Sequence, residues 1–376
     1  MPTVAPTVPT AAIDAVVKQT YPGPWGVELG IYKNGIPLYE HGYGLRDRGL
    51  PDTFIPIPNF WGLPQPDKTY NLVRGAFAPD ANTIFNMASV TKEFTAAAIL
   101  LLQQDGKLSL NDPLAKYFPN FPHSNEITLL YLMQHRSGLA DYVDHFVTQY
   151  PDFAPAYQAF MGSGQTDFSA TVGQLATYPL NFTPGTRFEY SNSNYLFLGL
   201  IVAQVSGEPL GAYLQQRIFT PLGMTQTHDG GYGPPVSDFA LGYRDDGAGP
   251  VRTWQWNLLW IAGPGGLTST VRDMEKWDQA VRRPGIFTQA TLTQMFTPSP
   301  FAAPYGAYAA GWFISTLGGH PYIWHDGGLG GFQTMNATIP DLGIDIIILT
   351  NDGTGTGPYF IVPQIFSLVT APPHTP

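Results

Sequence analysis

The chain has 376 residues, of which 44% are hydrophobic, 12% are charged and none is cysteine, and its formal net charge is −10. This length is sufficient for a sizeable hydrophobic core in one large domain or two closely packed ones. An acidic chain without a basic run argues against nucleic acid and anionic membrane surfaces as partners. The lack of cysteine excludes disulfides, thiol catalysis and thiolate metal sites.

The first twelve residues, "MPTVAPTVPTAA", lack the basic segment and apolar core of a signal peptide. Their composition predicts a flexible leader over residues 1–20, followed by a single folded domain over 21–376. The same stretch is also consistent with a stub left after signal removal, which favours a secreted or periplasmic protein over a cytoplasmic one. No run of 18 apolar residues occurs, so we expect no membrane-spanning helix.

The first half of the chain predicts a hairpin followed by helices. Apolar runs at 27–33 and 36–42 flank Asn34-Gly35, a pair typical of a two-residue turn between antiparallel strands. The Pro-rich, aromatic stretch at 44–80 has no clear periodicity, and we expect a flap or an insert there. Apolar helices are expected at 89–105, 128–135, 195–206 and 209–219.

After residue 251 the pattern changes to one helix and several strands. We expect an amphipathic helix at 270–280, a terminal helix at 358–369, and strands at 308–316, 322–324, 331–339 and 343–350. Strands near both chain ends predict an α+β fold with one antiparallel sheet flanked by helices, about 21–110 and 251–376. An all-helical subdomain would be formed by about 111–250.

The helix expected at 89–105 begins with a polar "SVTK". On a helix, Ser89 and Lys92 lie on one face, about 5–6 Å apart at Cβ. A serine hydroxyl is a weak nucleophile until a base takes its proton, and a lysine whose pKa is lowered by burial can do so. The alternative is a helix-terminal serine beside a surface lysine.

A second polar cluster, "FEYSNSNYLFLGL", precedes the helix expected at 195–206. The Tyr190 phenol could act as a base or proton shuttle, and the Asn192 amide could hold a substrate carbonyl. The alternative is N-capping by the serines and asparagines. Capping explains those residues but not the tyrosine.

A third cluster, "WHDGGLGGFQT", places His325 and Asp326 at the end of a strand, before four glycines. Glycines such as Gly327 and Gly328 permit close backbone approach, so that N–H groups there can meet a substrate oxygen. The alternative is a tight turn. The eight histidines form no H-E-x-x-H pattern and G-x-S-x-G is absent, so we expect no metal and no α/β-hydrolase site.

In this order, S-x-x-K, Y-x-N and H-x-G resemble the serine β-lactamase and penicillin-binding-protein superfamily. The branch most similar holds class C β-lactamases, D-alanyl-D-alanine carboxypeptidases, D-aminopeptidases and family VIII esterases. The resemblance extends from Trp25 to Asn351 and includes "ITLLYLMQHRSGL" and "GGLTSTVRDMEKW". It implies a β-lactamase/transpeptidase-like fold and a cofactor-free serine hydrolase that works through an acyl-enzyme.

The resemblance also implies roles for individual residues. The catalytic ones would be the acylated nucleophile Ser89, the proton-transfer pair Lys92 and Tyr190, and His325, which would face Tyr190 across the cleft. Asn192 would contact the acyl side of the substrate. The backbone N–H groups of Ser89 and Gly328 would form the oxyanion hole, with Gly327 beside them.

Asp326 departs from the pattern of relatives that bind a free carboxylate, which often carry threonine there with a lysine before it. Two like charges 4 Å apart repel by about 4 kcal/mol at an effective dielectric constant near 20. Efficient β-lactamase or carboxypeptidase activity is therefore disfavoured. A neutral ester, lactone or amide remains, or a substrate with a free amine that Asp326 could receive.

We therefore expect a serine hydrolase that acts on a small neutral carboxylic ester or related acyl compound. A D-amino-acid-type peptidase or amidase is the next alternative, before a carboxypeptidase or β-lactamase. Aromatic residues at 49–70 and Trp254, Trp256 and Trp260 could line an apolar acyl pocket. A catalytically inactive binding or scaffold protein is the alternative of another class, and the sequence indicates no oligomeric state.

Overall fold

The structure is a computed structural model that describes residues 8–23, 25–48, 77–143, 169–229, 238–245, 249–252, 261–353 and 357–371. The aromatic stretch at 49–70 and the three tryptophans at 254, 256 and 260 lie outside the described residues. Their expected place in an acyl pocket therefore stays a prediction.

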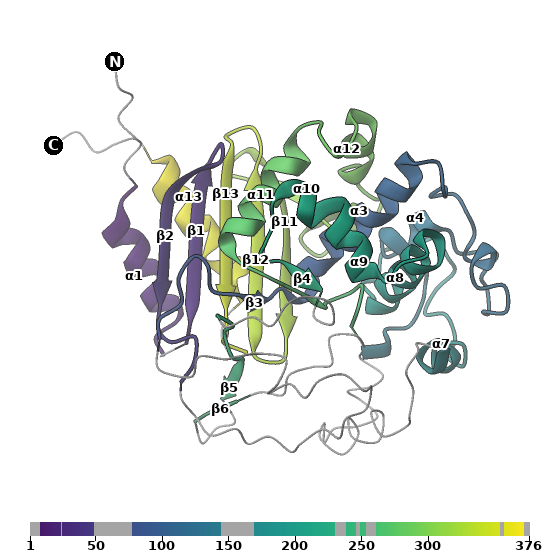
Figure 1. Cartoon of the computed structure of the whole chain (residues 1–376), viewed down its shortest axis with the longest axis horizontal. Helices are drawn as coiled ribbons and strands as arrows, with labels where there is room; N and C mark the ends of the chain where they lie inside the picture. Colours follow the sequence, from purple (N-terminus) through teal and green to yellow (C-terminus); the bar gives the residue numbers. More distant parts are fainter. Residues whose placement is uncertain are drawn as a thin grey trace.

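An antiparallel sheet built from both chain ends forms the centre of the fold (Figure 1). Its strands are β1 (Val27–Lys33), β2 (Ile36–Tyr43), β8 (Ala302–Ala303), β9 (Gly306–Tyr308), β10 (Phe313–Leu317), β11 (His320–Leu329), β12 (Phe332–Ile339) and β13 (Ile344–Thr350). Their order in the sheet is β2-β1-β13-β12-β11-β10-β9-β8. β1 pairs with β13, with Val27 opposite Thr350, and this pairing joins the two ends of the chain. The predicted fold class is confirmed.

The predicted hairpin connects β1 to β2. Asn34 and Gly35 have φ angles of +53° and +84°, the left-handed conformation that a two-residue hairpin turn requires. The strand predicted at 322–324 is longer than expected, because β11 continues to Leu329. His325, Asp326 and the first two glycines thus lie within a paired strand and not in a turn after it.

Residues 10–20, which we expected to belong to a flexible leader, instead form helix α1 (Thr10–Thr20). Its Ile13 and Val17 are one helical turn apart and both are buried. They pack in one cluster with the terminal helix α13 (Val362–Thr370) on one face of the sheet. A helix of this length is stabilised mainly by such packing, which the Pro/Thr/Ala composition does not reveal.

Successive side chains of the central strands face opposite sides of the sheet. Ile346 and Ile348 of β13 join the cluster of α1 and α13, whereas Ile347 and Leu349 join the larger cluster on the other face. There α11 (Val271–Arg282) lies against the sheet. The sheet is therefore covered by helices on both faces.

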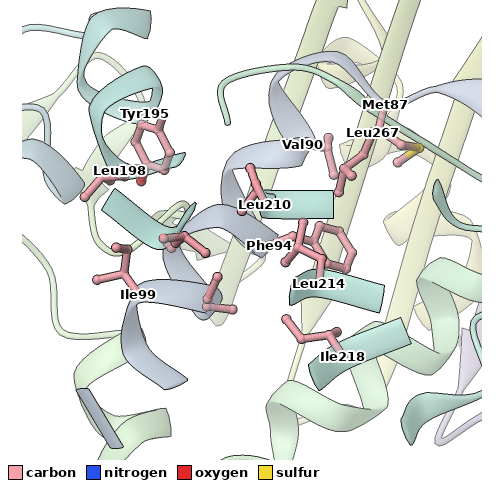
Figure 2. Close-up of a cluster of buried hydrophobic side chains, with 14 of the residues drawn as sticks. Met87, Val90, Phe94, Ile99, Tyr195, Leu198, Leu210, Leu214, Ile218 and Leu267 are labelled. Carbon is pink, nitrogen blue, oxygen red and sulfur yellow. The ribbon is translucent and has the colours of Figure 1, made fainter. Parts of the chain in front are cut away.

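The larger cluster contains α3 (Thr91–Gln104), which follows a 3₁₀ turn, η1 (Ala88–Val90). The α3 side chains are buried from Thr91 to Leu102, and the helix packs against α8 (Asn192–Ser206). Figure 2 shows Phe94 and Ile99 of α3 among side chains from α8 and from α9 (Leu210–Leu214). The start of α3 is thus held between the sheet and the helical side of the molecule.

The remaining elements are short. The other helical segments are η2 (Leu114–Lys116), α4 (Leu129–Met133), α7 (Ser169–Leu175), η3 (Gln215–Phe219), α10 (Thr220–Leu222), α12 (Gln289–Met295) and η4 (Pro358–Phe360). Two small sheets contain β3 (Phe85–Asn86), β7 (Leu267–Ser269) and β4 (His228–Asp229), and β5 (Tyr243–Asp245) with β6 (Pro250–Arg252). Within the described ranges, no single helix is long and apolar enough to cross a membrane, although α8 and Leu210–Leu222, bent by 72°, pass together on length and composition.

Candidate active site

Ser89 lies in the tight turn between β3 and α3. The preceding Ala88 has φ +46°, a conformation that a residue with a Cβ adopts only where its surroundings hold it. The Ala88 N–H donates to Oδ1 of Asn86 at 2.8 Å, and Oγ1 of Thr334 donates to the Met87 carbonyl at 2.9 Å. The turn that carries Ser89 is therefore fixed from both sides.

Lys92 is completely buried and contacts Ser89 directly. Its Nζ lies 2.9 Å from Ser89 Oγ, 2.8 Å from Asn192 Oδ1 and 2.8 Å from the Pro264 carbonyl oxygen. Burial lowers the Lys92 pKa to about 7, although the carboxylates of Asp141 and Asp326 act in the opposite direction. A neutral amine, able to accept the Ser89 proton, is thus accessible near neutral pH.

Tyr190 completes the group around the serine. Its side chain has a hydrogen bond with Ser89, and its ring lies 4.9 Å from Lys92 Nζ. Burial raises the Tyr190 pKa well above its ordinary value, despite the bond to Ser89. The phenol therefore keeps its proton at neutral pH and is suited to relay a proton rather than to start as a phenolate.

Asn192 is the first residue of α8, and its side chain faces Lys92. Asp141 Oδ2 accepts hydrogen bonds from the Asn192 backbone N–H at 2.8 Å and from its Nδ2 at 2.9 Å. These bonds leave Oδ1 of Asn192 directed at Lys92. Both ends of the Asn192 amide, which we expected to contact the substrate, are thus hydrogen-bonded within the protein. No local sequence pattern indicated a role for Asp141.

His325 points away from the pocket and into the protein, where its side chain is 1% exposed. Nδ1 lies 2.5 Å from the Asp326 carbonyl oxygen, so we assign the ring proton to Nδ1, and the Tyr308 hydroxyl then donates to Nε2 at 2.9 Å. Burial lowers the His325 pKa to about 3, and the charge of Lys92 adds to this effect. The neutral ring lies 6.2 Å from that of Tyr190, centroid to centroid.

Asp326 points the other way. Its side chain is 50% exposed and lines the pocket beside Ser89. Partial burial raises the pKa of the Asp326 carboxyl above its ordinary value, and the charge of Lys92 opposes this shift. The alternation of side chains along β11 therefore separates two adjacent residues that we had placed in one cleft.

The pocket has a volume of about 310 Å³ and is lined by Ser89, Phe188, Tyr190, Pro304, Tyr305, Phe313, Asp326, Gly327 and Gly328. A Cβ on Gly327 would lie 2.5 Å from Thr334 Oγ1 and 2.6 Å from the Met87 carbonyl oxygen, so only glycine lets β11 approach the serine turn this closely. A Cβ on Gly328 would meet nothing within 4 Å. The backbone at Gly328 thus borders the open pocket that Ser89 faces.

His135 is a further residue that sequence reasoning missed. It is fully buried, has φ +53°, and stacks on the Tyr190 ring with centroids 4.3 Å apart. The Ser191 N–H donates to its Nδ1 at 3.2 Å. It lies in the stretch "ITLLYLMQHRSGL", which carried part of the family resemblance but indicated no role for this residue.

Among the residues that the structure describes, one group of carboxylates has ligand atoms close enough together for a metal. Ligand atoms of Glu275, Asp278 and Asp345 lie within 4.8 Å of one another. However, the Arg282 guanidinium forms an ion pair with Asp345, so a cation already lies beside the group. None of these residues lines the pocket around Ser89. We therefore assign no metal to this cluster.

The antiparallel sheet, its helical cover and a serine hydrogen-bonded to a buried lysine define a protein of the serine β-lactamase and penicillin-binding-protein type. The chain belongs to the Beta-lactamase family, whose model matches residues 24–362. This family is part of a superfamily of serine hydrolases that includes amidases, penicillin-binding proteins and β-lactamases.

Similar proteins from two bacteria support membership in this family. The chain is 28% identical to penicillin-binding protein 4* of Bacillus subtilis (strain 168) over 286 residues, which is 72% of this chain and 61% of that protein. It is 27% identical to protein flp of Staphylococcus aureus (strain COL) over 337 residues, 87% of this chain and 59% of that protein. The chain thus spans less than two thirds of the length of these relatives.

Solved structures agree with the fold. The D-amino acid amidase of Ochrobactrum anthropi SV3, in complex with L-phenylalanine, is 26% identical, covers 96% of both chains and gives a TM-score of 0.71. The octameric penicillin-binding protein homologue of Pyrococcus abyssi is 25% identical, covers 96% of this chain and 77% of that one, and gives a TM-score of 0.75.

Proposed function

We propose that this protein is a serine hydrolase that is acylated at Ser89 and acts on neutral carboxylic esters and related acyl compounds. The observation that carries the proposal is the 2.9 Å contact between Ser89 Oγ and the buried Lys92 Nζ at the wall of an open pocket. A buried amine with a pKa of about 7 is a suitable base for a serine hydroxyl at neutral pH.

In the acylation step, neutral Lys92 takes the proton of Ser89 while Oγ attacks the substrate carbonyl carbon. The carbonyl oxygen becomes an oxyanion, stabilised by the backbone N–H groups of Ser89 and Gly328 and by the positive end of the helix that begins there. When the intermediate collapses, the bond to the leaving group breaks. Tyr190 relays the proton from Lys92 to that group, which departs and leaves an ester on Ser89.

Deacylation repeats these steps with water as the nucleophile. Water gives a proton through Tyr190 to Lys92 and attacks the acyl carbon. The second tetrahedral intermediate then collapses and releases the carboxylic acid, while Lys92 returns the proton to Ser89. We propose that His325 is a positioning residue for Lys92 and Tyr190 and does not contact the substrate. Its neutral ring packs near Tyr190 and holds Tyr308 and the β11 backbone in place.

Two observations bear on the substrate. Asp326 lines the pocket beside Ser89, so a substrate carboxylate would meet a like charge there. This favours esters and amides without a free carboxylate over β-lactams and C-terminal peptides. An amidase or peptidase for amino-acid-type substrates is the second candidate, because Asp326 can receive an amine and a D-amino acid amidase is among the similar structures.

The proposal is tested by hydrolysis of a neutral aryl ester beside a chromogenic cephalosporin. We expect ester turnover well above cephalosporin turnover, and loss of both in Ser89→Ala. Ser367→Ala, which removes an exposed serine on α13, is the matched control and should behave as the wild type. Faster cephalosporin turnover would move the protein to the β-lactamase side, and absence of serine-dependent turnover would favour a binding or scaffold protein.

A further inference from the structure

Asp326 brings a negative charge to the pocket beside Ser89. Among the described residues that line it, Asp326 has the only side chain with a formal charge at neutral pH, and the others are aromatic, glycine, proline or serine. Its side chain is 50% exposed although it belongs to a strand within the sheet. A carboxylate is therefore presented to any molecule that reaches Ser89.

The Asp326 carboxylate can still accept hydrogen bonds from a ligand. The carboxylate interacts with its own backbone N–H, and Nδ1 of His325 lies 4.0 Å away. The Nδ1 proton of that neutral ring is directed at the Asp326 carbonyl oxygen. Lys92 Nζ forms its hydrogen bonds with Ser89, Asn192 and the Pro264 carbonyl oxygen and not with Asp326. Among the described residues, no lysine or arginine therefore forms an ion pair with Asp326.

The walls around this carboxylate suit a cation as well. Phe188, Tyr190, Tyr305 and Phe313 line the same pocket, and the rings of Tyr305 and Phe313 lie 6.4 Å apart, centroid to centroid. Aromatic faces attract ammonium groups within about 6 Å of the ring. A carboxylate with aromatic neighbours is an arrangement that binds an organic ammonium and repels an anion.

We propose that Asp326 binds an ammonium group on the acyl side of the substrate, so that aminoacyl esters and amides are preferred over uncharged acyl compounds. This inference rests on the proposed function, because it places the amine relative to a carbonyl attacked by Ser89. Both residues line one pocket of about 310 Å³, so the ammonium group and the scissile carbonyl of one small substrate can lie there together.

The test compares the methyl esters of three acids: phenylalanine in both enantiomers, N-acetylphenylalanine, and 3-phenylpropanoic acid, which lacks the amine. Rates are measured at pH 7, where a substantial fraction of the α-amino group carries a proton. We expect kcat/KM for the better amino ester to exceed that of both uncharged esters by about tenfold, the effect of one charge-assisted contact. In Asp326→Asn this ratio should fall to about one.

Asp341→Asn is the matched control, because it removes the same charge from an exposed residue that pairs with His320 outside the pocket. It should keep the wild-type ratio. A ratio near one in the wild type, or a high ratio kept in Asp326→Asn, with turnover that depends on Ser89, would overturn the inference and leave the proposed function standing. Absence of Ser89-dependent turnover of every ester would overturn the proposed function, and the inference with it.

A measurement on the wild type alone avoids any dependence on the folding of Asp326→Asn. Phenylethylamine and 2-phenylethanol share a ring and a two-carbon chain, but only the amine is charged. We expect the amine to inhibit ester hydrolysis at about tenfold lower concentration, with an advantage that decreases at high ionic strength. Equal inhibition by the two compounds would contradict an ammonium site at Asp326.

Discussion

Asp141 fixes the orientation of the Asn192 amide. Its Oδ2 accepts hydrogen bonds from the Asn192 backbone N–H and from Nδ2, at 2.8 and 2.9 Å. The amide oxygen is thereby left for Lys92, whose Nζ lies 2.8 Å away. Asp141 therefore acts on Lys92 through Asn192 and also raises the Lys92 pKa by its charge.

We predict that Asp141→Asn lowers kcat for ester hydrolysis by about 10- to 100-fold, because hydrogen bonds to a charged group contribute about 1.5–3 kcal/mol. Loss of the carboxylate should also lower the Lys92 pKa and move the acidic limb of the pH profile to lower pH. Asp105→Asn, which breaks an ion pair with Arg217 at the surface, is the control. A kcat loss without a shift of the limb would contradict coupling between Asp141 and Lys92.

The second prediction concerns pH. The folded-state pKa of Lys92 is lowered from 10.5 to about 7, so the protonated amine dominates below that pH and the neutral amine above it. If neutral Lys92 is the base, kcat/KM for a neutral ester should rise through pH 7 and be lost as pH falls below it. Burial lowers this pKa, the charges of Asp141 and Asp326 raise it, and burial keeps His135 and His325 neutral.

Lys92→Arg provides the matching variant, since a guanidinium stays protonated at every accessible pH. General-base catalysis contributes about 10²–10⁴-fold, and we expect a loss in that range. If Lys92→Arg retains the wild-type rate and the same rise of kcat/KM near pH 7, another group takes the serine proton.

The third prediction is that the Asp326 carboxylate lowers kcat/KM for substrates that carry a negative charge. We predict that Asp326→Asn raises kcat/KM for a chromogenic cephalosporin by about tenfold, because the repulsion of its carboxylate is removed and solvent screens part of that repulsion. Asp341→Asn, with the same change in net charge, should have no such effect. Unchanged cephalosporin turnover in Asp326→Asn would indicate that the substrate carboxylate lies elsewhere.

Helix α1 gives a prediction on stability. Ile13 is fully buried between α1, α13 and the sheet, so Ile13→Ala should lower the free energy of unfolding by about 2–5 kcal/mol. Gln19→Ala, an exposed change on the same helix, should stay within about 0.5 kcal/mol of the wild type. Denaturant unfolding measures both, and equal values would mean that α1 is not part of the cooperative fold.

Sequence reasoning located residues whose motifs are local. Ser89 and Lys92 share the start of one helix, and the Asn34-Gly35 turn dictates the first hairpin, so short-range rules were sufficient for both. The sheet class followed from strand-like runs near both chain ends. Helix boundaries were also close, because apolar periodicity and terminal glycines are local signals.

Other features depend on contacts between distant segments. Asp141 meets Asn192 across 51 residues of chain, and His135 stacks on Tyr190 from a different loop. Tyr308 binds His325 only because β9 and β11 lie in one sheet. The opposite directions of His325 and Asp326 follow from the extension of β11, which the glycines concealed.

The central claim is that Ser89 carries the acyl group. It is tested most directly by mixing the protein with a slowly hydrolysed neutral aryl ester, quenching in acid, and locating the added mass by peptide mass spectrometry. We predict one acyl group per chain on the peptide that contains Ser89, and none in Ser89→Ala. Ester turnover without an adduct at Ser89, or with the adduct on another residue, would contradict the account.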